Sequence, residues 1–253
     1  MHEVKSQPAM NLEEELVALH EAPREVPPFS QRYPGLTPAA GYAAARRLHE
    51  HRLAQGWRPV GRKIGFTNRT LWDRYGVHEP LWGWVYDRTL IEAPDNKANV
   101  SLTNLVQPRI EPEIAFKLNK SLEVEWMAHS VEIVQCHHPQ WKFTIADCTA
   151  DNGLHGRLIV GTPIPLAGDL AKAEARLFKG DQQVDKGVGA NVLGGPLLSL
   201  AHLVELLKGH PHAPLRPGEI ITTGVLTDAH PVARGDTWRT EVTGFPGLSL
   251  RFA

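Results

Sequence analysis

The spacing of apolar residues along the chain changes once, near residue 57. Before that point apolar residues recur every three or four positions, which is the period of an amphipathic helix. One helix is predicted over residues 11–21, and a second begins at the Thr37–Pro38 pair, a capping hydroxyl followed by proline, and ends before Gly56. We therefore expect residues 1–56 to form an N-terminal helical part.

From residue 57 to the C-terminus the period is mostly two, as expected of strands. Glycine and proline (22 and 20 residues) make up about 17% of the chain, above the usual sum of roughly 12%, which favours short strands and turns over a helical bundle. The predicted fold class is α+β, with residues 57–253 as one strand-rich unit. Strands are predicted over residues 60–66, 109–118, 131–136, 173–178, 218–223, 237–242 and 248–252, and one further helix over 197–208.

Composition excludes several classes of function. The 253 residues carry 27 basic and 28 acidic side chains, a formal net charge of −1, which argues against a nucleic-acid or membrane-surface partner recognised by bulk charge. No apolar run reaches the roughly 18–20 residues that span a bilayer. Residues 1–11 are polar and lack the apolar core of a signal peptide, and the two cysteines, Cys136 and Cys148, make no disulfide framework. We expect reduced thiols and a cytoplasmic location.

The most informative segment is the strand predicted over residues 109–118. Because successive side chains of a strand point to opposite faces, Glu111 and Glu113 share one face. Two carboxylates so placed repel each other unless a positive charge lies between them, and Mg²⁺ or Mn²⁺ prefers carboxylate oxygens. Apolar residues are expected to point from the other face into the core, namely Ile110, Pro112, Ile114, Phe116 and Leu118.

A solvated edge strand explains the same pattern without a metal. Proline is tolerated at the edge of a sheet, as Pro112 would be, and Arg109 and Lys117 on the same face could neutralise the two acids. From spacing alone the edge strand is the commoner outcome, because a Glu-x-Glu pair is a weak motif.

Two further residues carry charge inside predicted strands. Glu132 lies in a β-branched strand, and burying a lone carboxylate is costly unless it is paired or bound to a metal. Lys63 shares its strand face with Gly61 and Gly65, which leaves open space around the ammonium for an anionic ligand. The alternatives are that Glu132 is exposed or paired with a basic residue, and that Lys63 is an ordinary surface lysine.

The remaining polar clusters give weaker signals. Asp147 and Asp151 are spaced to meet on one helical face, but capping and turn chemistry also explains Asp151, since Asn152–Gly153 is a turn signal. The chain shows no nucleotide-binding or nucleophile motif. Four histidines lie in loop-like contexts without zinc-site spacing and are predicted at the surface: His137, His138, His210 and His212.

Taken together, these segments resemble the 2-keto-4-pentenoate hydratase / 2-oxohex-3-enedioate (4-oxalocrotonate) decarboxylase family of the fumarylacetoacetate hydrolase-like superfamily. The resemblance begins near Trp57 and runs to the C-terminus. It rests on segments that follow one another in the family's order, residues 61–67 (GRKIGFT), 108–116 (PRIEPEIAF), 132–134 (EIV), 141–152, 194–196 (GGP) and 215–220 (LRPGEI).

The resemblance implies a mixed β-roll body and a Mg²⁺ or Mn²⁺ site whose three carboxylates map onto Glu111, Glu113 and Glu132. The family's active-site lysine maps onto Lys63, and we take Asp151 as a second candidate catalytic residue. Family members act in meta-cleavage pathways of aromatic degradation on small 2-oxo or 2-hydroxy-dienoic acids, and they form homo-oligomers. A pathway enzyme is a further candidate partner.

The implied activity is hydration of a 2-hydroxy-2,4-dienoate, and decarboxylation of a 2-oxo-3-enedioate is the alternative. A cation near the far end of the substrate would favour the decarboxylase, and Arg62, Arg69 and Lys142 are the candidates. A carbon–carbon bond hydrolase is ranked lower, because the hydrolases compared carry aspartate where this chain has Glu132. The third reading, ahead of the hydrolase, is an inactive binding protein with the family fold.

Three departures from the family pattern concern the pocket. The segment 114–131 is shorter than usual and lacks most of a helical stretch, which could open the pocket or change subunit packing. Leu81 replaces an aspartate that is frequent in the family, and Val225 replaces a serine. These replacements put the proton-transfer group and some substrate contacts in doubt.

Overall fold

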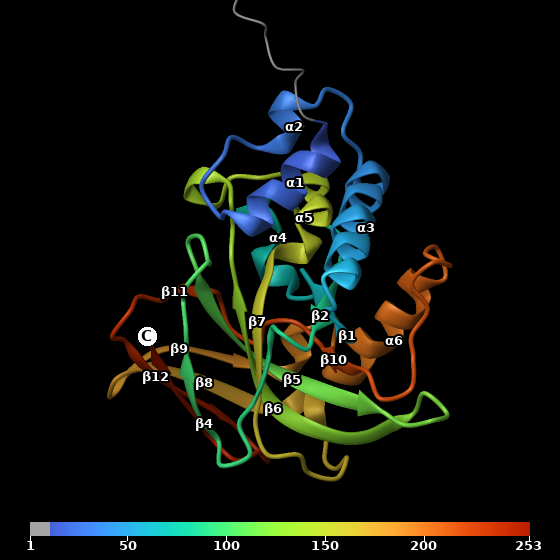
Figure 1. Cartoon of the computed structure of the whole chain (residues 1–253). Helices are drawn as coiled ribbons and strands as arrows, with labels where there is room; N and C mark the ends of the chain where they lie inside the picture. The colour runs from blue at the N-terminus through green and yellow to red at the C-terminus, as the bar shows by residue number, and fades with distance from the viewer. Residues whose placement is uncertain (1–10) are drawn as a thin grey trace, which may run out of the picture.

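A layer of helices covers one end of a curled sheet in the computed structural model, which describes residues 11–253 (Figure 1). The stretch that we interpreted as lacking a signal peptide lies, except for Asn11, outside the described residues. No helix of the described part is both long and apolar enough to cross a membrane. Cys136 and Cys148 are free and buried, as expected of thiols that form no disulfide.

The N-terminal helices follow the sequence prediction closely. They are α1 (Leu12–Glu21), α2 (Phe29–Arg32) and α3 (Pro38–Ala54). Asn11 caps α1 and Thr37 caps α3, each side chain accepting a backbone N–H three residues later. Their apolar faces pack together with Ala150 in one cluster, which contains Leu16, Leu19, Val26, Phe29, Ala44 and Leu48.

A short helix from the body joins this layer. Helix α5 (Ile145–Ala150) crosses α3 at Gly41, where a Cβ atom would lie 2.2 Å from the hydroxyl oxygen of Thr149. Only glycine allows this close approach. The helical layer therefore contains residues from both sides of the boundary that we placed at residue 57, and the division into two parts stays a prediction.

The larger sheet has eight strands in the order β2-β1-β10-β5-β6-β7-β3, with β11 pairing with β5 beyond β10. It is mixed, because β1 runs parallel to β10 and β3 parallel to β7, whereas the other neighbours are antiparallel. Its strands are β1 (Pro59–Gly65), β2 (Leu81–Tyr86), β3 (Leu90–Glu92), β5 (Arg109–Leu118), β6 (Val124–Val134), β7 (His155–Val160), β10 (Ile220–Thr222) and β11 (His230–Pro231).

A second sheet of five strands packs on one face of the first. Its order is β4-β13-β12-β8-β9, from β4 (Lys97–Val100), β8 (Glu174–Lys179), β9 (Gln182–Val188), β12 (Thr237–Val242) and β13 (Leu248–Phe252). The apolar face of β5 points into the core next to this sheet, with Ile110 beside Leu248 and Phe252. All five residues expected to point inward from this strand are buried, but the register shift after Lys117 places Leu118 in the core cluster on the opposite face of the sheet.

The other face of the large sheet is also covered. Helix α6 (Pro196–Leu207) buries Leu203 and Leu207 against Ile64 and Ile221 of the neighbouring strands. The short elements α4 (Trp72–Tyr75) and α5 lie over the same sheet nearer the helical layer (Figure 1). A polar residue on this face is therefore buried unless it lines a pocket.

The edge-strand interpretation of residues 109–118 is wrong. Strand β5 lies in the middle of the sheet, between β6 on one side and β10 with β11 on the other. Pro112 is tolerated there because it falls in the gap between β10 and β11, where its carbonyl accepts the N–H of Leu226 and no ladder N–H is required of it.

The predicted α+β class is confirmed, and each predicted strand is present with ends shifted by up to two residues, except for β6, which begins seven residues before its prediction. The sequence pattern did not reveal β2, whose six residues are all buried and show no alternation. It also missed the short or irregular strands β3, β4, β7, β9 and β11.

Candidate metal centre

Three glutamates meet at the centre of the large sheet. Glu111 and Glu113 come from β5, and Glu132 comes from β6, where it lies directly opposite Glu111 in the antiparallel register. One carboxylate oxygen from each lies within 4.8 Å of the other two. Directly opposed residues of two strands share one face, so the register itself brings these like charges together.

These carboxylates are far less solvated than ordinary surface acids. The side chains of Glu113 and Glu132 are fully buried, and Glu111 is partly exposed. One oxygen of Glu113 accepts the N–H of Gly224 at 3.0 Å, whereas its Oε1 has no hydrogen-bond partner. A buried carboxylate oxygen without a partner is costly, and it marks a direction in which a ligand is missing.

Lys63 is the cation closest to this group. Its Nζ lies 3.1 Å from Oε2 of Glu132 and donates a hydrogen bond to the carbonyl of Gly153 at 2.9 Å. Its side chain is buried, so the surface-lysine alternative is wrong. A Cβ at Gly65 would lie 3.2 Å from Nζ, as expected if Gly65 makes room for the ammonium.

The role expected for Gly61 is not observed. A Cβ there would lie 2.0 Å from the carbonyl oxygen of Ile220 on β10, so the absence of a side chain allows two strands to pair rather than opening the pocket. Of the two glycines beside Lys63, only Gly65 contributes space to the site.

His155 is a member of the site that the sequence did not reveal. Its Nδ1 lies 2.8 Å from Oε1 of Glu132, and its Nε2 lies 2.9 Å from the hydroxyl oxygen of Thr89. The ring therefore fixes one oxygen of Glu132 while Lys63 approaches the other. His155 is the first residue of β7, a strand that the sequence pattern did not predict. No spacing rule links His155 to Glu132.

The pKa values of the three glutamates show how unfavourable it is to charge all of them without another cation. Burial raises the pKa of Glu111 to about 8, with Lys63 opposing the shift. Burial and then repulsion by Glu132 and Glu111 raise the pKa of Glu113 well above its ordinary value. Burial acts in the same direction on Glu132, but Lys63 and the hydrogen bond with His155 outweigh it and lower that pKa.

One lysine therefore balances one of the three acids. The donor set consists of three carboxylates, which are hard oxygen ligands of the kind that Mg²⁺ and Mn²⁺ select. The unpartnered oxygen of Glu113 and the raised pKa of two acids fit the presence of a divalent cation among them. These residues form a candidate metal site.

Asp151 lies between two histidines. Its Oδ1 lies 2.8 Å from Nε2 of His20 and its Oδ2 lies 2.7 Å from Nδ1 of His137. Burial opposes the charge, but His137 and His20 outweigh it and lower the pKa of this carboxyl. The carboxylate does not line the pocket described below, and it directly precedes the turn whose Gly153 carbonyl accepts from Lys63.

The surface prediction for His137 and His138 is wrong, because both are fully buried. They lie three and four residues after the end of β6, and the helical layer covers them: His138 packs edge-on against Phe29. The prediction is right for His212, which is exposed, whereas His210 is half-buried with its ring against Tyr42 and Trp82.

An apolar pocket leads to Lys63 and Glu111. Tyr75 and Phe143 stack with ring centroids 5.8 Å apart on one side, and Trp141 and Phe66 contribute further aromatic surface. The pocket is lined by Lys63, Gly65, Phe66, Asn68, Leu71, Tyr75, Glu111, Val134, Trp141, Phe143, Gly153, Leu154, Gly224, Val225 and Ala229. Such a site suits a small ligand with an apolar body and a charged end.

The positions at which the chain departs from its family pattern lie in or beside this pocket. Val225 is part of the wall, and Leu81 is buried beside Gly65 and Gly153. The short segment after Glu113 forms a plain hairpin in which residues 119–123 connect β5 to β6. The hairpin brings Glu132 directly opposite Glu111 without an intervening helix.

The cations that we expected at the far end of the substrate do not line the pocket. Arg62 is buried elsewhere and forms an ion pair of 2.7 Å with Glu219. Arg69 and Lys142 are exposed. The prediction of a far-end cation at one of these three residues is therefore not supported by the pocket lining.

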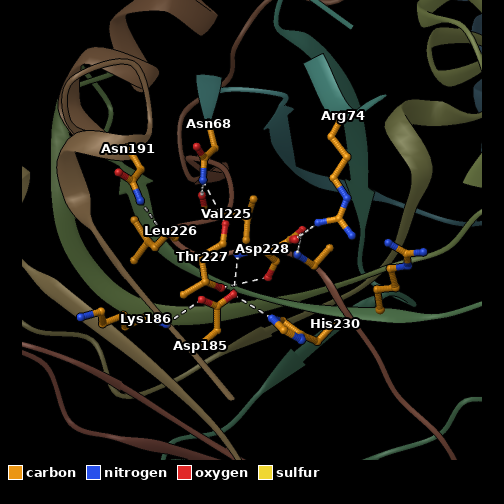
Figure 2. Close-up of polar contacts among 12 residues, drawn as sticks. Asn68, Arg74, Asp185, Lys186, Asn191, Val225, Leu226, Thr227, Asp228 and His230 are labelled. Atoms are coloured by element: carbon orange, nitrogen blue, oxygen red, sulfur yellow. Dashed lines mark hydrogen bonds and ion pairs between the residues drawn. The ribbon is translucent and has the colours of Figure 1, made fainter. Parts of the chain in front are cut away.

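One pocket wall is a loop without regular structure, held from several elements (Figure 2). Asn68 donates to the carbonyls of Val225 and Thr227, at 3.3 and 3.0 Å. Asp185 of β9 accepts the N–H of Asp228 at 3.0 Å. The side chain of Asp228 forms an ion pair with Arg74 of α4. Asn68 after β1, Asp185 of β9 and Arg74 of α4 thus fix the segment that presents Gly224 to Glu113.

Comparison with known proteins places these features in context. No family model matches the chain. It is 32% identical to the 2-hydroxyhexa-2,4-dienoate hydratase of Comamonas testosteroni, over 90% of this chain and 91% of the relative. It is 30% identical to the 4-oxalocrotonate decarboxylase of Pseudomonas sp. strain CF600, over 90% of each chain.

A solved structure shares the whole fold. The 4-oxalocrotonate decarboxylase from Pseudomonas putida G7, complexed with magnesium and adipate, superposes with a TM-score of 0.88 over 96% of each chain, at 26% identity. The similarity covers the helical layer and the curled sheet alike. It establishes the fold predicted from the resemblance, N-terminal helices followed by a mixed β-roll.

Glu113→Gln is expected to weaken Mg²⁺ and Mn²⁺ binding by at least about tenfold, because it removes one charged oxygen ligand from a buried site. In the unchanged protein the affinity should rise between pH 6 and pH 8, since the metal must displace protons from carboxyls whose pKa is raised, that of Glu111 to about 8. Titration calorimetry at several pH values measures both effects.

The matched control is Glu125→Gln, an exposed acid at the start of β6, seven residues before Glu132. It should leave the affinity unchanged. Unaltered metal binding by Glu113→Gln would remove this residue from the site, and a pH-independent affinity would contradict the proposed displacement of protons.

Proposed function

Because the chain belongs to the 2-keto-4-pentenoate hydratase / 4-oxalocrotonate decarboxylase family, we propose that it is a divalent-metal-dependent hydratase. It would add water to a 2-hydroxy-2,4-dienoate of the 2-keto-4-pentenoate type and give a 4-hydroxy-2-oxo acid, in the meta-cleavage degradation of aromatic compounds. The observation that carries the proposal is the group of three glutamates and Lys63 at the charged end of an apolar pocket.

The residues proposed to hold the cation are Glu111, Glu113 and Glu132. When bound, Mg²⁺ or Mn²⁺ supplies Lewis-acid chemistry, which favours a substrate with a carboxylate next to a 2-oxo or 2-hydroxy group. The solved relative is complexed with magnesium, which supports the choice of metal. The apolar walls exclude water from around the diene and strengthen every charge interaction inside the pocket.

Lys63 is proposed as the catalytic residue of this chain. Burial disfavours its ammonium, but Glu132 and then Glu111 and Glu113 outweigh burial and raise its pKa, so it is charged at neutral pH. A charged Nζ at the pocket wall can stabilise negative charge that develops on the substrate oxygen or pass a proton to the carbon chain. The Gly153 carbonyl holds Nζ in place for either role.

Asp151, which we predicted as a catalytic residue from the sequence, is proposed to act through Gly153. Its two hydrogen bonds with His20 and His137 fix the turn that follows it, and this turn presents the Gly153 carbonyl to Lys63. This arrangement would make Asp151 a positioning residue, because its carboxylate does not line the pocket.

The second candidate activity is decarboxylation of a 2-oxo-3-enedioate. It needs the same stabilisation of negative charge on the C2 oxygen, with carbon dioxide leaving instead of water adding. The similarity to 4-oxalocrotonate decarboxylases supports it. Assembly into a homo-oligomer and association with a pathway enzyme stay predictions.

The proposal is tested by the ultraviolet absorbance of 2-hydroxypenta-2,4-dienoate mixed with the purified protein. With Mg²⁺ present the dienol band should disappear as 4-hydroxy-2-oxopentanoate forms, and excess EDTA should prevent the change. A stable band with Mg²⁺ would contradict the hydratase. Carbon dioxide release from 2-oxohex-3-enedioate in a parallel assay would then establish the decarboxylase instead.

Lys63→Met should lower turnover by about 10²-fold or more, the usual contribution of a positioned proton-transfer group. Methionine keeps the length of the side chain and removes the charge, so the fold should be retained. Metal affinity should stay the same or rise, because a competing cation is lost from beside Glu132. Steady-state rates with the accepted substrate and metal titration measure the two effects.

The matched control is Lys120→Met at the exposed hairpin turn, which should leave both quantities unchanged. Full activity of Lys63→Met would exclude the proposed role. A loss of activity accompanied by an equal loss of metal binding would instead indicate a purely structural role for Lys63.

A further inference from the structure

The candidate pocket contains few side chains that can give a proton to a bound molecule. Apart from the carboxyl of Glu111, the lining side chains that carry an N–H or O–H group are Lys63, Asn68, Tyr75 and Trp141. The amide of Asn68 donates to two backbone carbonyls at 3.3 and 3.0 Å, and the indole of Trp141 donates to another at 3.1 Å. Lys63 and Tyr75 are therefore the two donors left for a ligand.

Lys63 serves the charged end of the pocket. Its Nζ lies 3.1 Å from Oε2 of Glu132 and donates to the Gly153 carbonyl at 2.9 Å. Hydration of a 2-hydroxy-2,4-dienoate creates two new C–H bonds, one at C3 and one at C5, the carbon farthest from the carboxylate. One ammonium beside the glutamates does not account for both bonds, so the reaction calls for a second proton donor.

The hydroxyl group of Tyr75 is placed to be that donor. Its oxygen accepts a hydrogen bond from Nη1 of Arg109 at 2.8 Å, and within residues 11–253 its own hydrogen has no acceptor. The ring is held by stacking on Phe143, with centroids 5.8 Å apart, and by an edge contact with Phe66. A phenol that already accepts one hydrogen bond keeps its O–H free to donate to a ligand.

Tyr75 and Lys63 reach the pocket from different walls. Lys63 belongs to β1, whereas Tyr75 belongs to α4 and is bonded to β5 at Arg109. Arg109 precedes Glu111 by two residues on the same face of β5, which is about 6.6 Å along the strand at 3.3 Å per residue. Two donors on separate walls can serve two different carbons of one ligand.

The charges around Tyr75 favour a neutral hydroxyl that can lose its proton transiently. Burial raises the pKa of Tyr75, and Arg109 is the strongest influence against that shift. Arg74 acts in the same direction as Arg109, whereas Asp228 and Glu111 act in the same direction as burial. The hydroxyl is therefore protonated at neutral pH, and a phenolate formed from it is stabilised by a charge-assisted hydrogen bond from the guanidinium.

We propose that Tyr75 is the acid that protonates C5 of the dienoate and that Arg109 stabilises the phenolate left behind. The inference deepens the proposed hydratase function and rests on it. Arg109 does not line the pocket and acts through Tyr75, so it is a positioning residue. Trp141 holds its guanidinium, whose Cζ lies 4.3 Å from the ring centroid.

The proposed step balances as follows. After the 2-hydroxyl has lost its proton to solvent, the electron pair of C4=C5 takes the Tyr75 proton and forms the C5–H bond. The double bond shifts to C3=C4, the charge on the 2-oxygen becomes the second bond of a carbonyl, and the O–H pair stays on the phenolate. Solvent returns a proton to the phenolate. When water adds at C4 it loses one proton to solvent, and C3 takes a proton from Lys63, which solvent replaces.

The test compares two substrates, because one of them already carries the C5–H bond. 2-Hydroxypenta-2,4-dienoate needs protonation at C5, whereas 2-oxopent-3-enoate is the product of that step and needs only water. In the Mg²⁺-loaded full-length protein, Tyr75→Phe should lower dienoate turnover, corrected for the rate without protein, by about 10²-fold or more and keep 2-oxopent-3-enoate turnover within about threefold. Phenylalanine keeps the ring that stacks on Phe143, so the wall is retained.

Arg109→Gln should lower dienoate turnover by about tenfold, because glutamine can still donate to Tyr75 but lacks the charge that stabilises a phenolate. It should leave 2-oxopent-3-enoate turnover nearly unchanged. The matched control is Tyr33→Phe, the same chemical change in the helical layer, where the hydroxyl donates to Glu15. It should change neither rate.

Full dienoate turnover by Tyr75→Phe would overturn the role of Tyr75. An equal loss with both substrates would also overturn it, since the tyrosine would then act on the addition of water or only support the wall. Conversion of the dienoate but not of 2-oxopent-3-enoate by the unchanged protein would show that protonation at C5 does not come first, which contradicts the proposal. Inactivity of the unchanged protein with both substrates and Mg²⁺ would overturn the hydratase function itself.

Discussion

Three carboxylates packed into the middle of a buried sheet, with one lysine to balance them, form the constraint on which the rest of this site depends. Glu113 and Glu132 have no exposed surface, and burial and mutual repulsion raise the pKa of Glu111 and Glu113. Such a cluster opposes folding unless protons or a cation neutralise it. We interpret this unfavourable contribution to folding as the consequence of a site that binds a divalent cation tightly.

The fold supports this cluster through elements that are distant in the sequence. The β5–β6 hairpin sets the three glutamates on one face, and β1 brings Lys63 beside them. The gap between β10 and β11 admits the loop that offers Gly224 to Glu113. The helical layer contacts the site indirectly. His20 of α1 is hydrogen-bonded to Asp151, which directly precedes the turn whose Gly153 carbonyl accepts a hydrogen bond from Lys63.

The sequence predicted what depends on local order and missed what depends on register between distant strands. The period of β5 placed Glu111 and Glu113 on one face, and capping residues marked α1 and α3. The local sequence pattern identified neither the uniformly apolar β2 nor β7, which begins at His155, as a strand. The sequence therefore did not predict His155 as a site residue.

The most direct test of the central claim is a crystal structure of the protein soaked with Mn²⁺, with anomalous differences used to locate the ion. Our account predicts one strong peak among the carboxylates of Glu111, Glu113 and Glu132. A second set of side chains could in principle hold a metal, since ligand atoms of His20, His137 and Asp151 also lie within 4.8 Å of one another. A peak at that set alone, or no peak at the glutamates at saturating Mn²⁺, would contradict the account.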